Sequence, residues 1–303
     1  MSTFEKLSIN TATIKKASLA EALELSVAAG LKHIGLWRDK VAEVGLETAV
    51  ELVKASGLQV SSLCRGGFLT AADGAGQAAA LADNKAAILE AKALGTTEII
   101  MVVGGLPDFS VSPGAVDGGG EATAVAGGKD IVLARQRVAD RLAELVPFAL
   151  EHGVRLVLEP LHPMYAADRA VLSTLGQALD LAAPHPVEAV GVVVDTFHVW
   201  WDPSLREQIA RAGAAGRIAS YQVCDFNLPI AADALLSRGF MGDGVIDFAS
   251  IGQWVAEAGY NGVVEVEIFN EDIWNLPYAQ VVDTVKARYA ELVEPHLVRE
   301  LAG

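Results

Sequence analysis

The chain is poor in cysteine and in aromatic residues, and it has no long uncharged apolar run. Its two cysteines, Cys64 and Cys224, stand far apart, which excludes a disulfide framework and suits a reducing compartment. Aromatic residues make up only 6% of the chain, so we expect a core of aliphatic side chains. The first residues carry no apolar signal segment and no stretch is long enough to span a membrane, so we expect a cytoplasmic protein.

Positive charge is also scarce. Lysine and arginine number 23 against 38 acidic residues, which gives a formal net charge of −15. A chain with this charge repels a phosphate backbone, and this argues against nucleic acid as the main partner. Hydrophobic residues make up 52% of the 303 residues, so a large core is possible and disorder is not expected.

Strand and helix patterns alternate along the whole sequence. The expected strands are 7–10, 33–37, 58–64, 98–103, 155–159, 190–195, 218–224 and 262–267. The expected helices are 18–29, 46–56, 77–94, 131–152, 174–183, 205–212, 248–258 and 277–301. Parallel strands need crossover helices, and eight such units close into a (β/α)₈ TIM barrel, here one domain over 1–303. An open doubly wound sheet is the alternative, but no G-x-G-x-x-G loop follows an early strand.

One internal segment, 104–130, is rich in glycine, alanine and serine and shows no clear period. A loop of this length inside a compact domain is usually functional. We expect it to form a flexible lid over the strand ends, and an ordinary insertion is the alternative.

Polar side chains end four consecutive strands. Asp195 closes a buried run of valines, where a carboxylate is expected to meet a metal or a substrate hydroxyl, or else to cap the next helix. Glu159, Gln222 and Glu267 end the strands predicted before and after it. The carboxyl ends of barrel strands share one mouth, so these four side chains are expected to meet there.

Three carboxylates in one pocket repel each other unless a cation lies between them. With the amide oxygen of Gln222 the donor set is all oxygen, which suits Mn²⁺, our first expectation, or Mg²⁺, with Co²⁺ also open. Zinc prefers more imidazole or thiolate than this set offers. Glu265 shares a strand face with Glu267 and is expected to lie deeper, although a register shift would exchange the two roles.

The segments LEPLHP, VVVDTFH, YQVCD, GDGVID and VEVEIF resemble the xylose-isomerase-like barrel superfamily of sugar isomerases and epimerases. The superfamily includes ketose 3-epimerases, hydroxypyruvate isomerases and inosose-acting enzymes. The resemblance implies one divalent metal held by a glutamate, an aspartate, a histidine and a glutamate on strands five to eight. Glu159, Asp195 and Glu267 match this pattern, whereas Gln222 stands where the family has histidine.

Two histidines are predicted to be catalytic. His198 matches the family histidine that follows the strand-six aspartate and touches the substrate; a histidine at a helix start is the alternative. His162 lies in a turn stiffened by prolines on both sides, and its ordinary pKa of about 6.5 suits proton transfer.

Four further residues are predicted to bind substrate. Arg65, at the end of a strand, is a candidate clamp for an anionic or hydroxyl-rich substrate, or else a surface ion-pair partner. Trp37 and Trp200 are candidates for stacking on a sugar face, with packing at the rim as the alternative. Asp225 matches the family aspartate three positions after the strand-seven ligand.

A metal that polarises a carbonyl stabilises the enediolate left when the neighbouring proton is removed. Reprotonation gives a sugar or cyclitol isomerase or epimerase, which is our leading expectation. Loss of a β substituent gives a lyase on 3-oxo-sugars, such as the large subunit of a C-glycoside deglycosidase. The glutamate that family epimerases carry after the strand-five ligand is absent, and Tyr165 stands in that region, which keeps the lyase open.

Two further functional classes are compatible with a barrel of this kind. A metal-free sugar sensor is one, and an apurinic-site endonuclease is the other, although six histidines and the acidic charge argue against an endonuclease. The expected partner is a small sugar substrate, with no membrane or nucleic acid. We expect a homo-oligomer, or a hetero-oligomer with a small subunit if the protein is a deglycosidase.

Overall fold

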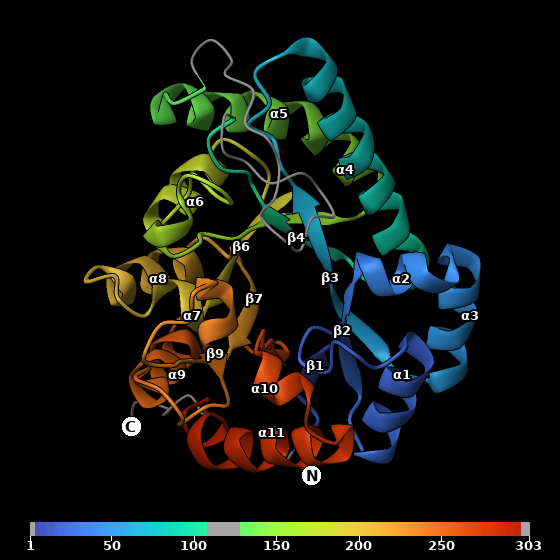
Figure 1. Ribbon diagram of the computed structural model, residues 1–303. Helices are drawn as coiled ribbons and strands as arrows, with labels where there is room; N and C mark the ends of the chain where they lie inside the picture. The colour runs from blue at the N-terminus through green and yellow to red at the C-terminus, as the bar shows by residue number, and fades with distance from the viewer. Residues whose placement is uncertain (1–3, 108–127, 298–303) are drawn as a thin grey trace.

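The computed structural model describes residues 4–107 and 128–297. Its centre is a closed parallel barrel in the order β1-β10-β7-β6-β5-β4-β3-β2, which confirms the predicted (β/α)₈ fold (Figure 1). The barrel strands are β1 (Leu7–Asn10), β2 (His33–Trp37), β3 (Gln59–Gly67), β4 (Glu98–Val102), β5 (Arg155–Leu158), β6 (Val190–Asp195), β7 (Ile218–Val223) and β10 (Val264–Val266).

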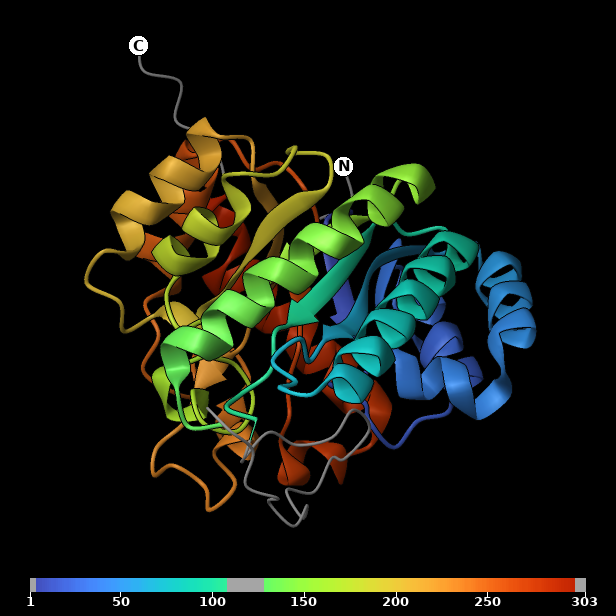
Figure 2. The same cartoon turned by 90° about the horizontal axis from the view of Figure 1, so that it is seen from above.

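An outer ring of helices surrounds the barrel in Figure 1, and Figure 2 shows helices of this ring lying across the outside of the strands. Local signals fix their ends: Ser18 forms a capping box with Glu21, and Gly153 ends a long helix in the left-handed conformation. The helices of the ring are α1 (Leu19–Ala28), α3 (Leu46–Ser56), α4 (Gly74–Leu94), α5 (Ile131–His152), α6 (Leu175–Ala182), α8 (Leu205–Ala214), α9 (Phe248–Glu257) and α11 (Tyr278–Leu292).

Short elements that the sequence did not predict follow several strands at the carboxyl end of the barrel. They are the helices α2 (Arg38–Val44), α7 (Thr196–Val199) and α10 (Glu271–Trp274), and the antiparallel pair β8 (Asp225–Phe226) and β9 (Arg238–Gly239). Elements of this length are too short to show a hydrophobic period. They nevertheless carry several side chains of the site described below.

Two predicted segments need comment. The last helix ends at Leu292 rather than at residue 301, and it is followed by a short 3₁₀ turn. Most of the predicted lid, residues 108–127, lies outside the described residues. Among the helices of the described parts of the chain, none is both long and apolar enough to cross a membrane.

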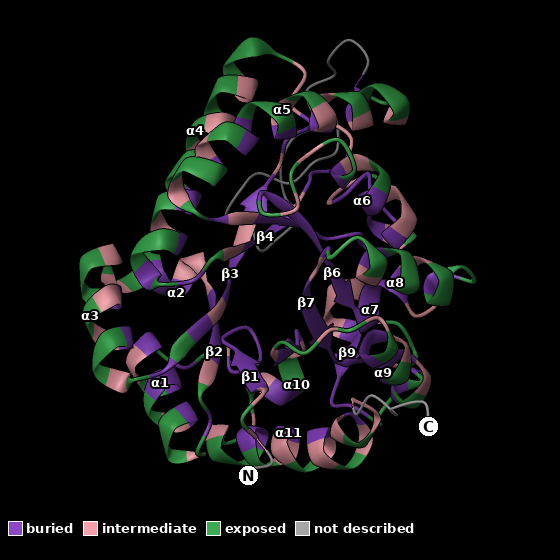
Figure 3. Cartoon of the chain, turned by 180° about the vertical axis from the view of Figure 1, so that it is seen from behind, coloured by how far each residue is buried: buried purple, intermediate pink, exposed green. Residues whose placement is uncertain are grey.

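The core has two layers. The larger one packs the ring helices against the outer faces of the strands, so that each helix is buried on its inner side and exposed outside (Figure 3). A smaller cluster belongs to consecutive strands and is formed by Cys64, Ile100, Val157, Val193 and Ala219. Side chains alternate between the faces of a strand, so the residues outside the larger cluster point toward the barrel axis.

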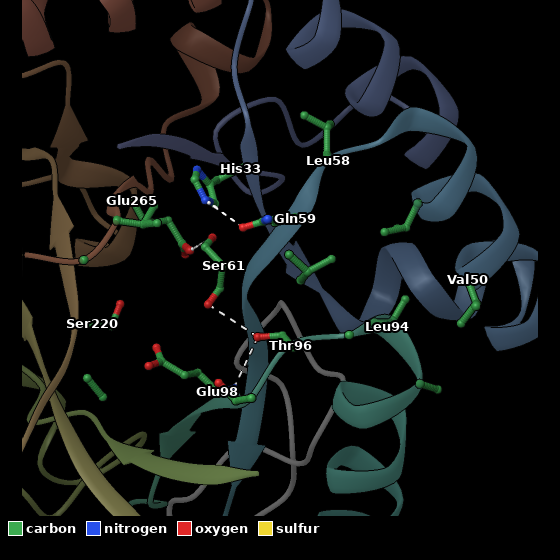
Figure 4. A pocket seen from close by; sticks show the side chains of 18 of the residues that line it. His33, Val50, Leu58, Gln59, Ser61, Leu94, Thr96, Glu98, Ser220 and Glu265 are labelled. Atoms are coloured by element: carbon green, nitrogen blue, oxygen red, sulfur yellow. Dashed lines mark hydrogen bonds between the residues drawn. The ribbon is translucent and has the colours of Figure 1, made fainter. Parts of the chain in front are cut away.

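A cavity of about 680 Å³ opens at the amino-terminal end of the strands. Figure 4 shows polar side chains around it, among them His33, Gln59, Glu98 and Glu265. Burial raises the pKa of Glu98 to about 8, although the positive charge of Arg155 opposes this shift. A carboxyl with a raised pKa stays protonated in the folded state at pH values where the unfolded chain has released its proton.

The substitution Glu98→Gln should therefore change how stability depends on pH. The folded-state pKa of Glu98 lies above the unfolded value. Above pH 8 the folded protein must therefore bury the charged carboxylate, and this lowers its stability. We expect Glu98→Gln to raise the melting temperature at pH 9 by about 2 °C, or about 1 kcal/mol, and to change it little at pH 5. Thermal unfolding at both pH values measures the difference, and an equal shift at both would contradict the assignment.

Candidate active site

Three buried carboxylates lie at the carboxyl end of the barrel. Glu159 follows β5, Asp195 ends β6 and Glu267 follows β10, and their residues are 5%, 0% and 3% exposed. Burial raises the pKa of all three, and the pKa of Glu267 reaches about 7. The negative charge of Asp195 adds to the shift of Glu159, so this pocket cannot hold three negative charges without positive charge beside them.

Two adjoining cavities open at this end of the barrel. The inner one, about 50 Å³, is lined by Glu159, Glu267, His198 and Arg238 among others. The outer one, about 470 Å³, leads toward the surface past β2 and α2. Both are lined by Trp37, Cys64, Arg65, Phe68, Arg169, Leu235 and Phe269. The shared lining makes them one continuous pocket above the carboxylates.

Arg238 supplies positive charge inside the structure. Its residue is 2% exposed, and its Nη1 lies 3.0 Å from Asp195 Oδ2 and 3.4 Å from Glu267 Oε2. The guanidinium also lies over the ring of Phe197, 4.7 Å from its centre. The buried Nε of Arg238 has no hydrogen-bond partner among the described residues. The arginine therefore compensates part of the carboxylate charge but keeps an unused donor.

A short hairpin and one aspartate hold Arg238 in place. Strand β9, which begins at Arg238, pairs with β8, which begins at Asp225. The Asp225 carboxylate accepts hydrogen bonds from the backbone N–H groups of Gly242 and Ile246, at 2.8 and 3.0 Å. Asn270 donates to the Arg238 carbonyl at 2.8 Å. Asp225 thus fixes the loop that follows the arginine and does not line either cavity of the pocket.

His198 has a donor on each side of its ring. The His162 N–H donates to its Nδ1 at 3.2 Å, and Arg238 Nη2 lies 2.9 Å from its Nε2. Burial, and next the charge of Arg238, lower the pKa of His198 well below its usual value. A neutral ring carries one N–H and cannot accept at both nitrogens. Either the His162 N–H or Arg238 Nη2 therefore faces a ring N–H and lacks an acceptor in this arrangement. An oxygen atom of a bound ligand could act as that acceptor.

Gln222 is oriented by Glu265. Its Nε2 donates to Glu265 Oε1 at 3.1 Å, and its Oε1 is buried without a hydrogen-bond partner among the described residues. Glu265 also accepts from Asn10 Nδ2 at 2.7 Å and from the hydroxyls of Ser61 and Ser62 at 2.5 and 2.9 Å. An ionised carboxylate only accepts, so the amide must present its nitrogen to Glu265 and its oxygen elsewhere.

The donors fit a hard divalent cation. Ligand atoms of Glu159, Asp195 and His198 lie within 4.8 Å of one another, and Glu267 borders the same inner cavity. The unpartnered oxygen of Gln222 belongs to the residue that pairs in register with Asp195. A cation bound there would relieve the carboxylate repulsion and satisfy this oxygen.

Trp37 acts on the carboxylate as well as lining the pocket. Its indole Nε1 donates to Glu267 Oε1 at 2.9 Å, and its ring packs edge-on against Phe269. Trp37 therefore holds one oxygen of Glu267 in a fixed direction. The deeper Glu265 faces Ser61 and the amino-terminal cavity instead (Figure 4).

Two other predicted residues lie beside the pocket and not in it. The ring of His162 packs against Trp201 and Phe226, and its Nδ1 accepts from the Met164 N–H at 3.3 Å. Trp200 packs against Phe226 as well. Neither His162 nor Trp200 lines the cavities described above, whereas Arg65, Trp37 and His198 do.

Sequence reasoning missed several lining residues. Arg238 has no sequence signal, because it stands in a segment with no strand pattern and only the hairpin brings it to the carboxylates. Arg169 follows a 3₁₀ turn, Phe68 comes directly after β3, and Phe269 lies three residues after the end of β10. The position of Phe269, two residues after Glu267, is a signal that could have placed it at the mouth.

Comparison with known proteins supports the barrel fold and identifies the family. The family model of the xylose isomerase-like TIM barrel matches residues 20–288. The crystal structure of protein SMc04130 from Sinorhizobium meliloti 1021 is 43% identical, with a TM-score of 0.86 over 95% of this chain and 98% of that one. A structure of the IolI protein with a bound zinc atom is 21% identical, with a TM-score of 0.76 over 96% and 99% of the two chains, and it shares the fold.

A curated relative is an inosose isomerase of Halalkalibacterium halodurans. It is 26% identical over 160 residues, which are 52% of this chain and 55% of that protein. The chain thus spans about half the length of the curated relatives it matches. The family match is much longer and contains Glu159, Asp195, Gln222 and Glu267, and on that evidence the chain belongs to the xylose isomerase-like TIM barrel family.

Proposed function

We propose that this protein is a divalent-metal-dependent isomerase or epimerase of a sugar or cyclitol. The observation that supports it most is the group of buried ligand atoms on Glu159, Asp195 and His198, all within 4.8 Å of one another, with Glu267 on the same inner cavity as Glu159 and His198. The inosose isomerases among the relatives act on cyclitol ketones by name, which is consistent with this proposal.

Glu159, Asp195, Gln222 and Glu267 would hold the metal, with His198 close enough to take part. Mn²⁺ is the metal we propose, because the set consists mainly of oxygen, and zinc becomes the better fit if His198 is a ligand. When bound, a divalent cation polarises a substrate carbonyl and makes the neighbouring proton easier to remove.

Glu267 is the residue we propose for proton transfer. It lines the inner cavity, and Trp37 fixes one of its oxygens, so its carboxylate has a defined direction toward a substrate bound there. Arg238 and His198 would supply donors to substrate oxygens, because each has a donor without an acceptor in this arrangement. His162, the base suggested by the sequence, would have to turn away from Trp201 to reach the cavity.

Metal binding should follow the donor set. After removal of metal with a chelator, we expect one equivalent of Mn²⁺ or Zn²⁺ to bind by titration calorimetry. The substitutions Glu159→Gln and Asp195→Asn should each weaken binding more than about 100-fold, because changes around metal ligands already cost 10- to 100-fold. Gln222→His should tighten binding of zinc. Glu98→Gln removes a carboxylate at the other end of the barrel and should leave the affinity unchanged; equal loss in this variant would count against the site.

Proton exchange should depend on Glu267. In D₂O, we expect the metal-loaded protein to place deuterium next to the carbonyl of an inosose or a ketose, as seen by NMR after the metal is chelated. Glu267→Gln, saturated with metal, should slow this exchange by at least about 100-fold, because it removes the acid–base group. Release of an aglycone from a 3-oxo-glycoside would identify a lyase instead. No exchange with any of these compounds, with metal bound, would reject the proposed reaction.

A further inference from the structure

One arginine of the outer cavity has no acidic partner. Arg65 lies in β3 near its end, and its guanidinium rests over the rings of Phe68 and Trp37, 4.2 and 5.6 Å from their centres. Within the described residues, no carboxylate oxygen lies within 4.0 Å of it. Two neighbouring cations of the same cavity are neutralised, because Arg38 pairs with Asp83 and Glu90, and Lys15 pairs with Asp39.

A second arginine adds to the positive potential at this place. Arg169 lines both cavities with Arg65, and its ion pairs with Asp168 and Asp233 are long, at 3.4 and 3.6 Å. Its buried Nε has no hydrogen-bond partner in the described parts of the chain. Burial, and next the positive charge of Arg169, lower the pKa of Arg65 to about 10. The two guanidinium groups thus repel each other, and the negative charge of Glu159 offsets only part of the shift, in a protein whose net charge is −15.

Apolar side chains form another part of the outer cavity. Trp37, Phe68, Leu235 and Phe269 line it, and its volume of about 470 Å³ has room for a substituted six-membered ring. Aromatic faces suit the C–H face of such a ring, and an unpaired guanidinium suits a planar oxyanion. Among the described residues that line the outer cavity, Arg65 is the one cation without an ion pair, so its charge suits a ligand group with a single negative charge. A phosphate dianion carries two negative charges, which is more than Arg65 alone can neutralise, because Arg169, Arg38 and Lys15 already have acidic partners.

We infer that the substrate carries a carboxylate, which Arg65 binds with help from Arg169, on a hydroxylated ring that packs against the apolar part of the outer cavity. This inference rests on the proposed function, since it names the substrate class of the same pocket. The carboxylate would lie toward the outer cavity, and the ketone and the exchanging proton would lie toward Glu159 and Glu267 in the inner one. Arg65 would thus select substrates by charge at a point remote from the reacting carbon.

Paired ligands test this by titration calorimetry on the full, metal-loaded chain. Quinate is a hydroxylated ring with a carboxylate, myo-inositol is a similar ring without one, and glucose 6-phosphate offers a phosphate. We expect quinate to bind at least about 10-fold more tightly than either of the others, since a charge-assisted bidentate pair is lost without it. Arg65→Gln should abolish the preference, and Arg65→Lys should restore part of it.

A control separates recognition from a change in overall charge. Arg211→Gln removes the same charge from α8, where Arg211 pairs with Asp180 on the surface, and it should keep the preference for quinate. Quinate binding no tighter than myo-inositol, including no measurable binding of either, would overturn the inference. So would a preference that survives Arg65→Gln, or tighter binding of glucose 6-phosphate.

These outcomes are independent of turnover, because none of the three ligands needs to react. A lost preference with intact proton exchange would reject the carboxylate and leave the proposed function in place. A retained preference with no proton exchange would reject the proposed reaction alone.

Discussion

The repulsion among three carboxylates buried at one barrel mouth is the constraint around which the rest of the site is arranged. Glu159, Asp195 and Glu267 have raised pKa values because water is excluded and because they face one another. Three features offset this repulsion: the buried guanidinium of Arg238, the indole N–H of Trp37 that donates to Glu267, and the Arg238 Nε–H, which has no acceptor among the described residues. Such a pocket is stable only as a place that takes up positive charge, whether as protons or as a metal ion.

Gln222 stands where the family resemblance predicts a histidine. Its amide is oriented by Glu265, which lies deeper in the barrel. Glu265 is held by Asn10, Ser61 and Ser62, so its charge is compensated without help from the metal. A carboxylate fixed in this way accepts the N–H of Gln222 and leaves the amide oxygen for the proposed cation. The amide oxygen is a harder donor than an imidazole nitrogen and is likewise neutral, so it would favour a harder metal without changing the charge of the donor set.

The fold and the carboxylates could be predicted from the sequence, whereas the residues that tune them could not. Alternating strand and helix patterns give the barrel order, and Asp195 stands out because a charged residue ends a buried run of valines. The roles of Arg238 and Asp225 depend on strands of two residues each, which leave no periodic signal. His162 and Trp200 lie next to site residues in sequence, but the turn after β5 and the helix α7 direct them toward Phe226. Side-chain direction outside regular elements is set by tertiary packing, which a single sequence does not display.

Glu265 belongs to both ends of the barrel, since it lines the amino-terminal cavity and also touches Gln222. In most barrels of this kind, the floor serves stability and the mouth serves chemistry, so the two can be redesigned separately. In this barrel the floor and the mouth are not separate, because Glu265 contributes to both. A substitution that fills the lower cavity, for example a larger side chain at Ser61, would also move Glu265 and so disturb the proposed metal site above it. Packing at the floor of this barrel and the geometry at its mouth are therefore coupled through one side chain.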